Sequence, residues 1–249
     1  MSDFKEFFSK NADSYAKSQS HKKGEDLGQL IQAINPVSSD IAIDLASGTG
    51  FTAMELAFHV SKVVAFDGTK EMLEKAESLA SERRIKNIDY VIGDVSELPY
   101  PENTFDIITC RRAAHHFTDK KKFLSESFRV LKKGGRLGLV DMAVPESDQH
   151  NVFNHIEFIR DNSHIAAEKV ETWKSLLEDT GFRLSNILTS SEEYTVENWL
   201  SPVKMESPEG KDLQKYLKET ANELLLEGNI NREEGTILKE RFVIIAEKP

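Results

Sequence analysis

The sequence predicts an α/β fold in which helices cover both faces of a doubly wound, mainly parallel sheet. Short, mostly apolar runs alternate with amphipathic stretches between residues 37 and 141, and Gly, Asp, Asn or Pro bounds each run. Runs that are apolar on both faces are typical of strands buried between two layers of helices. The expected strands are Ile41–Leu45, Val63–Phe66, Ile88–Ile92, Phe105–Cys110 and Leu137–Val140.

Hydrophobic periodicity predicts the helices between these strands. In Thr69–Ala80 and Asp119–Leu131, apolar residues recur at the three- and four-residue spacing of one helix face. Asp119 is the expected N-cap of the second helix. Lys132 to Gly134 should end it, because cations favour a helix C-terminus and Gly adopts the left-handed conformation there.

The remaining segments are expected to add helices around this core. Residues 1–35 are predicted to form an N-terminal helical lid, and residues 36–145 the core. Residues 146–249 should supply further strands and helical lid insertions over the substrate. Because no Pro-, Gly- or Ser-rich linker separates these parts, we expect residues 1–249 to form a single domain. The further elements are strands at Phe182–Leu188 and Arg241–Ala246, one helix within 146–181 that stops at Gly181, and one beginning at Ser207-Pro208.

Composition argues against several classes of partner. Asp plus Glu number 42 against 32 for Lys plus Arg, and the net charge of −10 opposes binding to nucleic acid and to anionic membranes. No apolar run approaches the ~20 residues that span a bilayer, and the first residues do not resemble a signal peptide. The single cysteine, Cys110, agrees with a reducing compartment, so a cytoplasmic location is expected.

A glycine turn follows the first strand and indicates a ligand site. Gly48 and Gly50 let the backbone approach a ligand closely, and Gly48 to Ala53 fits the G-x-G-x-x-A pattern of dinucleotide sites. However, Asp44 lies four residues before Gly48, where it would repel a pyrophosphate. S-adenosylmethionine carries an ammonium and a sulfonium instead of phosphates, so the same carboxylate would attract it.

Two more acidic residues follow the next two strands. Asp67 comes 17 residues after Gly50, where a carboxylate can accept both ribose hydroxyls of either kind of ligand. Asp94 follows the third strand and offers an acceptor near the expected adenine amino group. Three acids at the ends of three successive strands favour a cationic adenosyl ligand.

These motifs together resemble the class I S-adenosylmethionine-dependent methyltransferases, and more narrowly the branch that includes the ubiquinone/menaquinone biosynthesis methyltransferases. The resemblance covers roughly residues 10–185, with the motifs in the family's order and spacing. The segments that carry it are Asp44-Leu45-Ala46-Ser47-Gly48-Thr49-Gly50, Phe66-Asp67-Gly68-Thr69-Lys70-Glu71-Met72-Leu73, Gly93-Asp94-Val95-Ser96-Glu97-Leu98-Pro99-Tyr100, Phe105-Asp106-Ile107-Ile108 and Val130-Leu131-Lys132-Lys133-Gly134-Gly135.

The resemblance implies a Rossmann-like sheet of seven strands, the last of them antiparallel, and it assigns roles around S-adenosylmethionine. One departure concerns Ala46, which stands where the family's loop usually has its first glycine and so places a methyl group beside the cofactor. The implied cofactor contacts are Asp44 and the loop Ala46, Ser47, Gly48 and Gly50 for the methionyl part, Asp67 for the ribose, Gly68 and Met72 for the adenine pocket, Asp94 and Val95 for the adenine edge, and Tyr15 in a closing N-terminal segment.

Residues for the chemical step are expected directly after the fourth strand and in the lid. His115 and His116 lie beside the expected methyl group, although one of two adjacent histidines commonly only orders a loop. Arg111 is a candidate for contacting the cofactor or an anionic substrate. The lid adds four polar residues that would share one face of a helix, Glu157, Arg160, Asp161 and His164. Arg160 is the candidate for substrate binding, and Glu157 or His164 for proton transfer. The alternative is that these residues form ion pairs on a solvent-exposed helix face.

The sequence therefore predicts methyl transfer from S-adenosylmethionine to a small-molecule acceptor by in-line displacement. No spacing of ligands typical of a zinc site occurs, so no metal is predicted. Two alternatives stay open: an NAD(P)-dependent oxidoreductase, which Asp44 and the lack of a Tyr-x-x-x-Lys pair disfavour, and a non-catalytic protein that binds S-adenosylmethionine. A homodimer is also compatible with the sequence.

Overall fold

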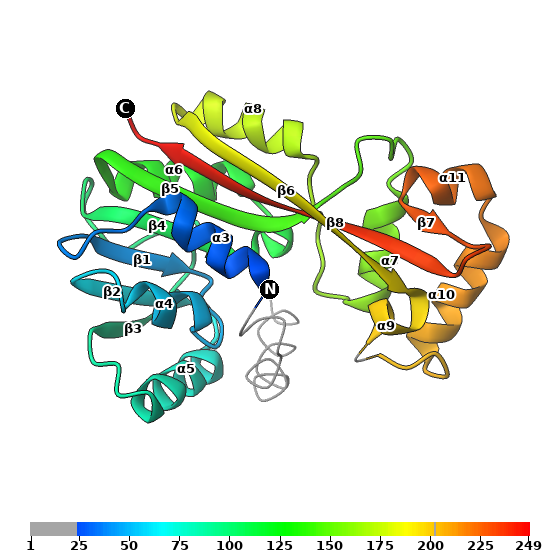
Figure 1. Ribbon diagram of the computed structural model, residues 1–249, viewed down its shortest axis with the longest axis horizontal. Helices are drawn as coiled ribbons and strands as arrows, with labels where there is room; N and C mark the ends of the chain where they lie inside the picture. Colours follow the sequence, from blue (N-terminus) through cyan, green and yellow to red (C-terminus); the bar gives the residue numbers. More distant parts are fainter. Residues whose placement is uncertain (1–23, 202) are drawn as a thin grey trace.

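The computed structural model describes residues 24–201 and 203–249, and a twisted sheet organises them (Figure 1). Seven of its strands follow the order β3-β2-β1-β4-β5-β8-β6, and the short β7 pairs with β8. Strands β1 to β5 pair in parallel, whereas β8 runs antiparallel to both β5 and β6. The predicted α/β class and antiparallel last strand are thus confirmed. The strands are β1 (Ile41–Leu45), β2 (Lys62–Asp67), β3 (Ile88–Ile92), β4 (Phe105–Arg111), β5 (Leu131–Ala143), β6 (Arg183–Thr195), β7 (Ile230–Asn231) and β8 (Thr236–Glu247).

Helices cover both faces of this sheet and bury two apolar layers. Helices α3 (Glu25–Ile34), α4 (Phe51–Leu56) and α5 (Lys70–Glu82) pack on one face, where Leu30 and Leu56 are fully buried. Helices α6 (Lys120–Val130) and α8 (Val170–Thr180) pack on the other, where Trp173 fills the core. The chain therefore passes over both faces of the sheet. Because β1 to β5 run parallel, their carboxyl ends lie at the same edge.

A second lobe, which we call the lid lobe, has an apolar core of its own. It comprises α7 (Val152–Arg160), α9 (Val196–Leu200), α10 (Pro208–Glu219), α11 (Asn222–Glu227) and β7. The long strands β6 and β8 run through both lobes and join them (Figure 1). The buried side chains of this core are Val152, Ile156, Trp199, Leu200, Leu213, Leu225, Ile230 and Ile237.

Several predicted caps form as expected. The Asp119 carboxylate accepts the Lys122 N–H at 2.8 Å at the start of α6. Ser207 caps α10 by accepting the Gly210 N–H, with Pro208 as the first helical residue. Gly181 adopts a left-handed conformation with φ = 104° after α8. These local signals are short-range, so the sequence alone determines them.

Other boundaries differ from the prediction. Helix α6 ends at Val130 and Gly134 lies inside β5, because its N–H donates to Lys248 O at 2.7 Å and continues the sheet. The stretch 146–181 forms two helices, α7 and α8, rather than one. Of the predicted lid 1–35, only α3 lies within the described residues.

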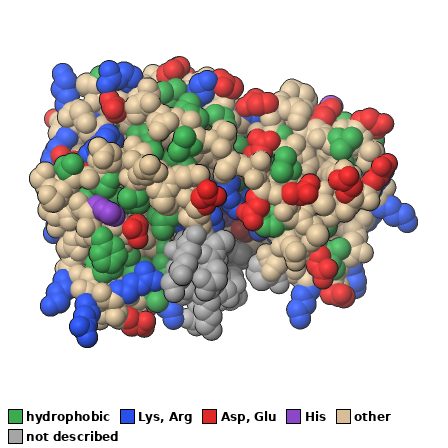
Figure 2. Space-filling view, in the orientation of Figure 1, with side chains coloured by type: hydrophobic (Ala, Val, Ile, Leu, Met, Phe, Trp, Pro, Cys, Tyr) green, Lys and Arg blue, Asp and Glu red, His purple; other side chains and the backbone are tan. Residues whose placement is uncertain are grey.

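The surface in view carries many acidic side chains over the lid lobe (Figure 2). This distribution agrees with the net charge of −10. Within the described ranges 24–201 and 203–249, no helix has the length and apolar content needed to cross a membrane.

Candidate functional site

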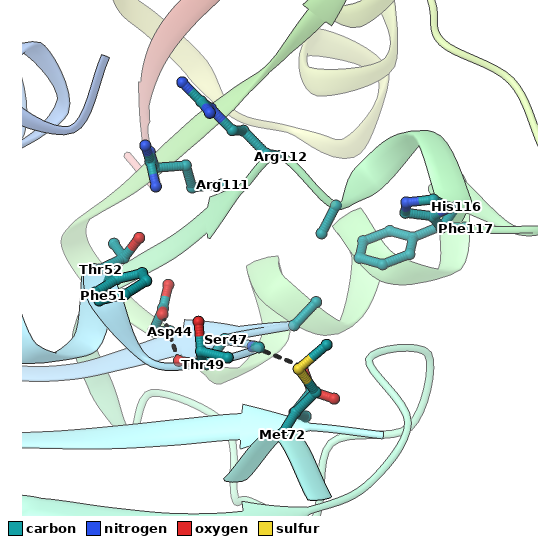
Figure 3. Close-up of a pocket in the computed structure, with 14 residues that line it drawn as sticks. Asp44, Ser47, Thr49, Phe51, Thr52, Met72, Arg111, Arg112, His116 and Phe117 are labelled. Atoms are coloured by element: carbon teal, nitrogen blue, oxygen red, sulfur yellow. Dashed lines mark hydrogen bonds between the residues drawn. The ribbon is translucent and has the colours of Figure 1, made fainter. Parts of the chain in front are cut away.

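A pocket lies at the carboxyl ends of β1, β2 and β4, where the strand order reverses between β1 and β4. Ligands of open α/β sheets bind at this position because loops from neighbouring strands diverge there. The pocket holds about 700 Å³ of space, part of it open to solvent. Its lining residues are Asp44, Ala46, Ser47, Gly48, Thr49, Phe51, Thr52, Asp67, Met72, Arg111, Arg112, Ala113, His116 and Phe117 (Figure 3).

Asp44 is a buried carboxylate at the end of β1. Its two oxygens accept the Ser47 hydroxyl at 2.6 Å and the Thr109 hydroxyl at 2.7 Å. Burial raises the pKa of Asp44 to about 6 despite these hydrogen bonds. The pocket wall therefore holds a carboxylate that a cationic ligand would stabilise in its charged form.

Asp67 stands at the end of β2, beside the glycine turn. One oxygen accepts the Gly48 N–H and the other the Thr69 N–H, each at 2.8 Å. Burial raises the pKa of Asp67, and the hydrogen bonds from these backbone groups oppose that rise. Each carboxylate oxygen has a second lone pair, so both can still accept hydroxyl groups of a ligand.

The turn from Ala46 to Gly50 requires positive φ at three residues. Gly48 and Gly50 have φ of 54° and 78°, and a Cβ at Gly50 would lie 2.8 Å from the Ala76 Cβ. Ala46 also has a positive φ of 52°. The alanine that departs from the family pattern thus occupies a conformation that glycine adopts without strain.

We expect Ala46→Gly to stabilise the protein by up to about 1 kcal/mol. The left-handed conformation costs an alanine about 1–2 kcal/mol, and the extra freedom of glycine in the unfolded chain offsets about 0.4–1 kcal/mol of that gain. Urea unfolding of both proteins measures the difference. A variant less stable than the parent would show that the Ala46 methyl group makes packing contacts worth more than the strain.

Arg111 and Arg112 line the pocket from the end of β4 and share one carboxylate on α3. Asp26 accepts two hydrogen bonds from each guanidinium, at 2.7–3.2 Å, and all three side chains are largely buried. Burial raises the pKa of Asp26, but the charges and hydrogen bonds of both arginines outweigh burial and set it at about 2. The three side chains thus form one buried cluster of ion pairs beside the pocket.

His116 and Phe117 lie beside each other at the end of the pocket away from Asp44 (Figure 3). His116 Nδ1 lies 2.9 Å from the carbonyl oxygen of Ser163, in the segment after α7. Burial and, to a smaller extent, the neighbouring His115 together lower the pKa of His116 to about 3. His116 is therefore a neutral imidazole at physiological pH.

His115 and His164 are placed next to the pocket but do not line it. His115 Nδ1 lies 2.6 Å from the Asp141 carboxylate on β5, and its backbone N–H donates to the same side chain. His164 Nε2 lies 2.8 Å from Asn154 Oδ1. Both histidines thus order the loops that carry them.

The predicted helix face of 157, 160, 161 and 164 is wrong, because α7 ends at Arg160. Glu157 is completely buried and binds Lys239 at 2.7 Å and Arg160 at 2.5 Å. Burial raises the pKa of Glu157, but these two cations lower it well below its usual range. Glu157 and Arg160 therefore bind each other instead of lining the pocket, and neither is placed to contact a ligand there.

Four predicted cofactor residues are not among those that line the pocket, and one lies outside the described residues. Asp94 is exposed, and its carboxylate accepts the N–H and the hydroxyl of Ser96. Gly68 follows Asp67 directly, Val95 packs on the core, and Gly50 caps α4. Tyr15 is the residue outside the described ranges. The adenine contacts assigned to Gly68, Asp94 and Val95 stay predictions.

Sequence reasoning missed several lining residues and the partner of the two arginines. Phe51 and Thr52 occupy unspecified positions of the G-x-G-x-x-A pattern, and Ala113 and Phe117 belong to no motif, so only the fold shows that these four residues line the pocket. Asp26 is 85 residues from Arg111, so no local pattern connects them. In the described residues, no cluster of three or more His, Cys, Asp or Glu side chains is arranged to hold a metal ion.

Several proteins with similar sequence or structure are named as methyltransferases. Residues 43–139 match the family described as a methyltransferase domain. The chain is 33% identical over 217 residues to the uncharacterized methyltransferase YcgJ of Bacillus subtilis (strain 168), and the match covers 87% of this chain and 86% of that protein. It is 41% identical over 107 residues to the ubiquinone/menaquinone biosynthesis C-methyltransferase UbiE of Escherichia coli O1:K1, over 41% of this chain and 43% of that protein.

A solved structure agrees with these relatives. The crystal structure of BH2331 from Bacillus halodurans C-125, assigned as a methyltransferase, superposes with a TM-score of 0.83 and 36% identity. The match covers 91% of this chain and all of that one. Together with the acidic pocket at the strand ends, these likenesses show that the chain belongs to the class I S-adenosylmethionine-dependent methyltransferases.

Proposed function

We propose that this enzyme transfers the methyl group of S-adenosylmethionine to a small-molecule acceptor by in-line displacement in the cytoplasm. The observation that carries the proposal is the pocket itself, which is lined by the buried carboxylates of Asp44 and Asp67. His116 and Phe117 lie at its end away from Asp44 (Figure 3). The carboxylates suit the cationic adenosyl cofactor. The aromatic end then offers room for the acceptor beside the methyl group.

The cofactor contacts follow from the positions of the charged side chains. Asp44 would attract the methionyl ammonium, and Asp67 would accept the two ribose hydroxyls while the Gly48 and Thr69 amides hold it in place. Met72, on the pocket wall, would contact the adenine. The guanidiniums of Arg111 and Arg112, which line the pocket, would suit the cofactor's carboxylate.

The chemical step depends more on the orientation of the methyl acceptor than on acid or base catalysis. When bound, the sulfonium supplies an activated methyl group, whose bond to sulfur breaks as the acceptor attacks from the opposite side. The pocket holds the acceptor in line, which by itself can supply much of the acceleration. With its pKa lowered to about 3, His116 is a weak base that accepts a hydrogen bond from the acceptor rather than storing its proton.

Asp67→Ala is expected to weaken S-adenosylmethionine binding by about 1.5–3 kcal/mol, or roughly 10- to 150-fold in Kd, because it removes a charge-assisted pair of hydrogen bonds. Isothermal titration calorimetry measures the change. Asp89→Ala is the matched control, since Asp89 is an exposed residue of β3 paired with Lys62. Equal Kd values for the parent and Asp67→Ala would refute the ribose assignment.

Turnover is tested by transfer of a labelled methyl group to a panel of phenols, amines, small acids and quinone precursors. The proposal expects formation of S-adenosylhomocysteine with at least one member, and loss of that product in Asp67→Ala at limiting cofactor. Tight cofactor binding without turnover on any acceptor would favour the non-catalytic alternative.

A further inference from the structure

The segment after α7, residues 161–167, fastens the turn that carries both histidines of the site. We call it the clasp. The amides of Ile165 and Ala166 both donate to the His115 carbonyl oxygen at 3.0 Å. One residue further along the turn, His116 Nδ1 lies 2.9 Å from Ser163 O and 3.2 Å from Ser163 Oγ. The clasp therefore binds both the backbone of the turn, at His115, and the side chain of His116.

The partners of Ser163 determine which nitrogen of His116 carries the proton. The Ser163 hydroxyl donates its one hydrogen to Asp161 Oδ1 at 2.6 Å, and the same oxygen of Asp161 accepts the Ser163 N–H at 2.9 Å. A carboxylate and a carbonyl can only accept hydrogen bonds. Both Ser163 atoms that face Nδ1 are thus acceptors, so Nδ1 must be the donor.

We propose that Asp161 and Ser163 are positioning residues that hold His116 as the Nδ1–H tautomer, so that Nε2 is the hydrogen-bond acceptor of the site. The inference rests on the proposed function only in taking the pocket beside His116 as the place of the methyl acceptor. A methyl acceptor that contacts Nε2 must then do so through a hydrogen-bond donor, an O–H or an N–H.

Burial and the surrounding charges agree with this tautomer. His116 is held neutral by burial and by the adjacent His115, whose ring centroid lies 4.0 Å away. The carboxylates of Asp141 and Asp161 raise the pKa of His116, but burial and His115 lower it by more. A neutral imidazole has one donor and one acceptor nitrogen, and the contacts with the clasp make Nδ1 the donor and Nε2 the acceptor.

Long-range ¹H–¹⁵N NMR of the full chain with ¹⁵N-labelled histidine tests the proposal without cofactor or acceptor. The His116 signals are assigned by their loss in His116→Gln. We expect a single neutral form with Nδ1 protonated at pH 7. An Nε2–H form, a mixture or an imidazolium in the parent protein would overturn the proposal.

Two variants separate the specific effect of Asp161 from general loosening of the loop. In Asp161→Ala, the Ser163 hydroxyl is released and can donate to Nδ1, so a second, Nε2–H form should appear. In Asp161→Ala with Ser163→Ala, that competing donor is gone, and the single Nδ1–H form should return. A single form in the first variant, or a mixture that persists in the second, would contradict the proposed role.

Asp119→Ala is the matched control, because the Asp119 carboxylate also accepts a backbone N–H, at the start of α6, but lies outside the clasp. It should leave the His116 tautomer unchanged, and a mixture in this variant would show that the tautomer follows general stability. Because the spectra need no ligand, failure of this inference is distinct from failure of the proposed function, which the Kd of Asp67→Ala tests.

Discussion

Replacing Asp26 by Ala is expected to lower the free energy of unfolding by about 3–5 kcal/mol, the usual cost of removing one partner from a buried ion pair. Asp26 is 4% exposed and accepts four hydrogen bonds from Arg111 and Arg112. Without it, two neighbouring guanidiniums repel each other in a largely buried site. The same change should loosen α3 from the pocket wall. Urea denaturation measures the loss of stability.

Glu25→Ala provides the control for this prediction. Glu25 lies in the same first turn of α3 but is exposed, so its loss should change stability by no more than about 0.5 kcal/mol. A similar small effect of Asp26→Ala would mean that the arginine pair does not depend on Asp26, and the account of this wall would be wrong.

The second large effect concerns Asp44 and pH. Its pKa is about 6 in the folded protein and about 4 when the chain is unfolded, so between these values the folded state binds more protons. The stability that protonated Asp44 contributes is therefore complete below about pH 4 and is lost as pH rises through about 6. A difference of roughly two pKa units corresponds to about 3 kcal/mol.

Comparison with Asp44→Asn isolates this contribution from those of other acids. We expect the stability of the cofactor-free parent, relative to the variant, to fall by about 3 kcal/mol between about pH 4 and pH 7. Denaturant unfolding across this pH range measures it. Parallel pH profiles for the two proteins would show that Asp44 does not titrate abnormally.

The same group should make cofactor binding depend on pH. A bound cation favours ionised Asp44, so below about pH 6 the binding of S-adenosylmethionine should displace a proton from Asp44. The Kd should then rise by up to about tenfold for each unit by which the pH falls below 6. Asp44→Asn should bind weakly at every pH. Asp44 thus destabilises the empty protein and stabilises the complex.

The core of the fold and the acidic wall of the pocket could be predicted from the sequence because their signals are local. Strand β1, the glycine turn and Asp44 follow one another within ten residues, and β2 leads directly into Asp67. The alternation of strands and helices then implies that these strand ends meet at one edge. Periodicity was enough for α5 and α6, since each buries the helix face that carries most of its apolar residues.

The lid lobe could not be predicted in the same way because tertiary contacts decide it. Glu157 looks like a base on a polar helix, yet Lys239, 82 residues away, neutralises it in the interior. Asp161 and His164 continue the helical spacing, but the Asp161 carboxylate binds the Ser163 N–H and hydroxyl and α7 ends before it. Interactions between distant residues leave no pattern in a single sequence.

The central claim is that the acidic pocket binds S-adenosylmethionine, and a thermal-shift comparison tests it most directly. The protein is heated alone and with saturating S-adenosylmethionine, S-adenosylhomocysteine or NAD(H). A ligand at 100 times its Kd adds about 2.7 kcal/mol, which raises Tm by roughly 5–10 °C in a chain of this length. We expect this rise with both sulfur ligands and none with NAD(H). A rise with NAD(H) alone would contradict the account of Asp44 and of the pocket.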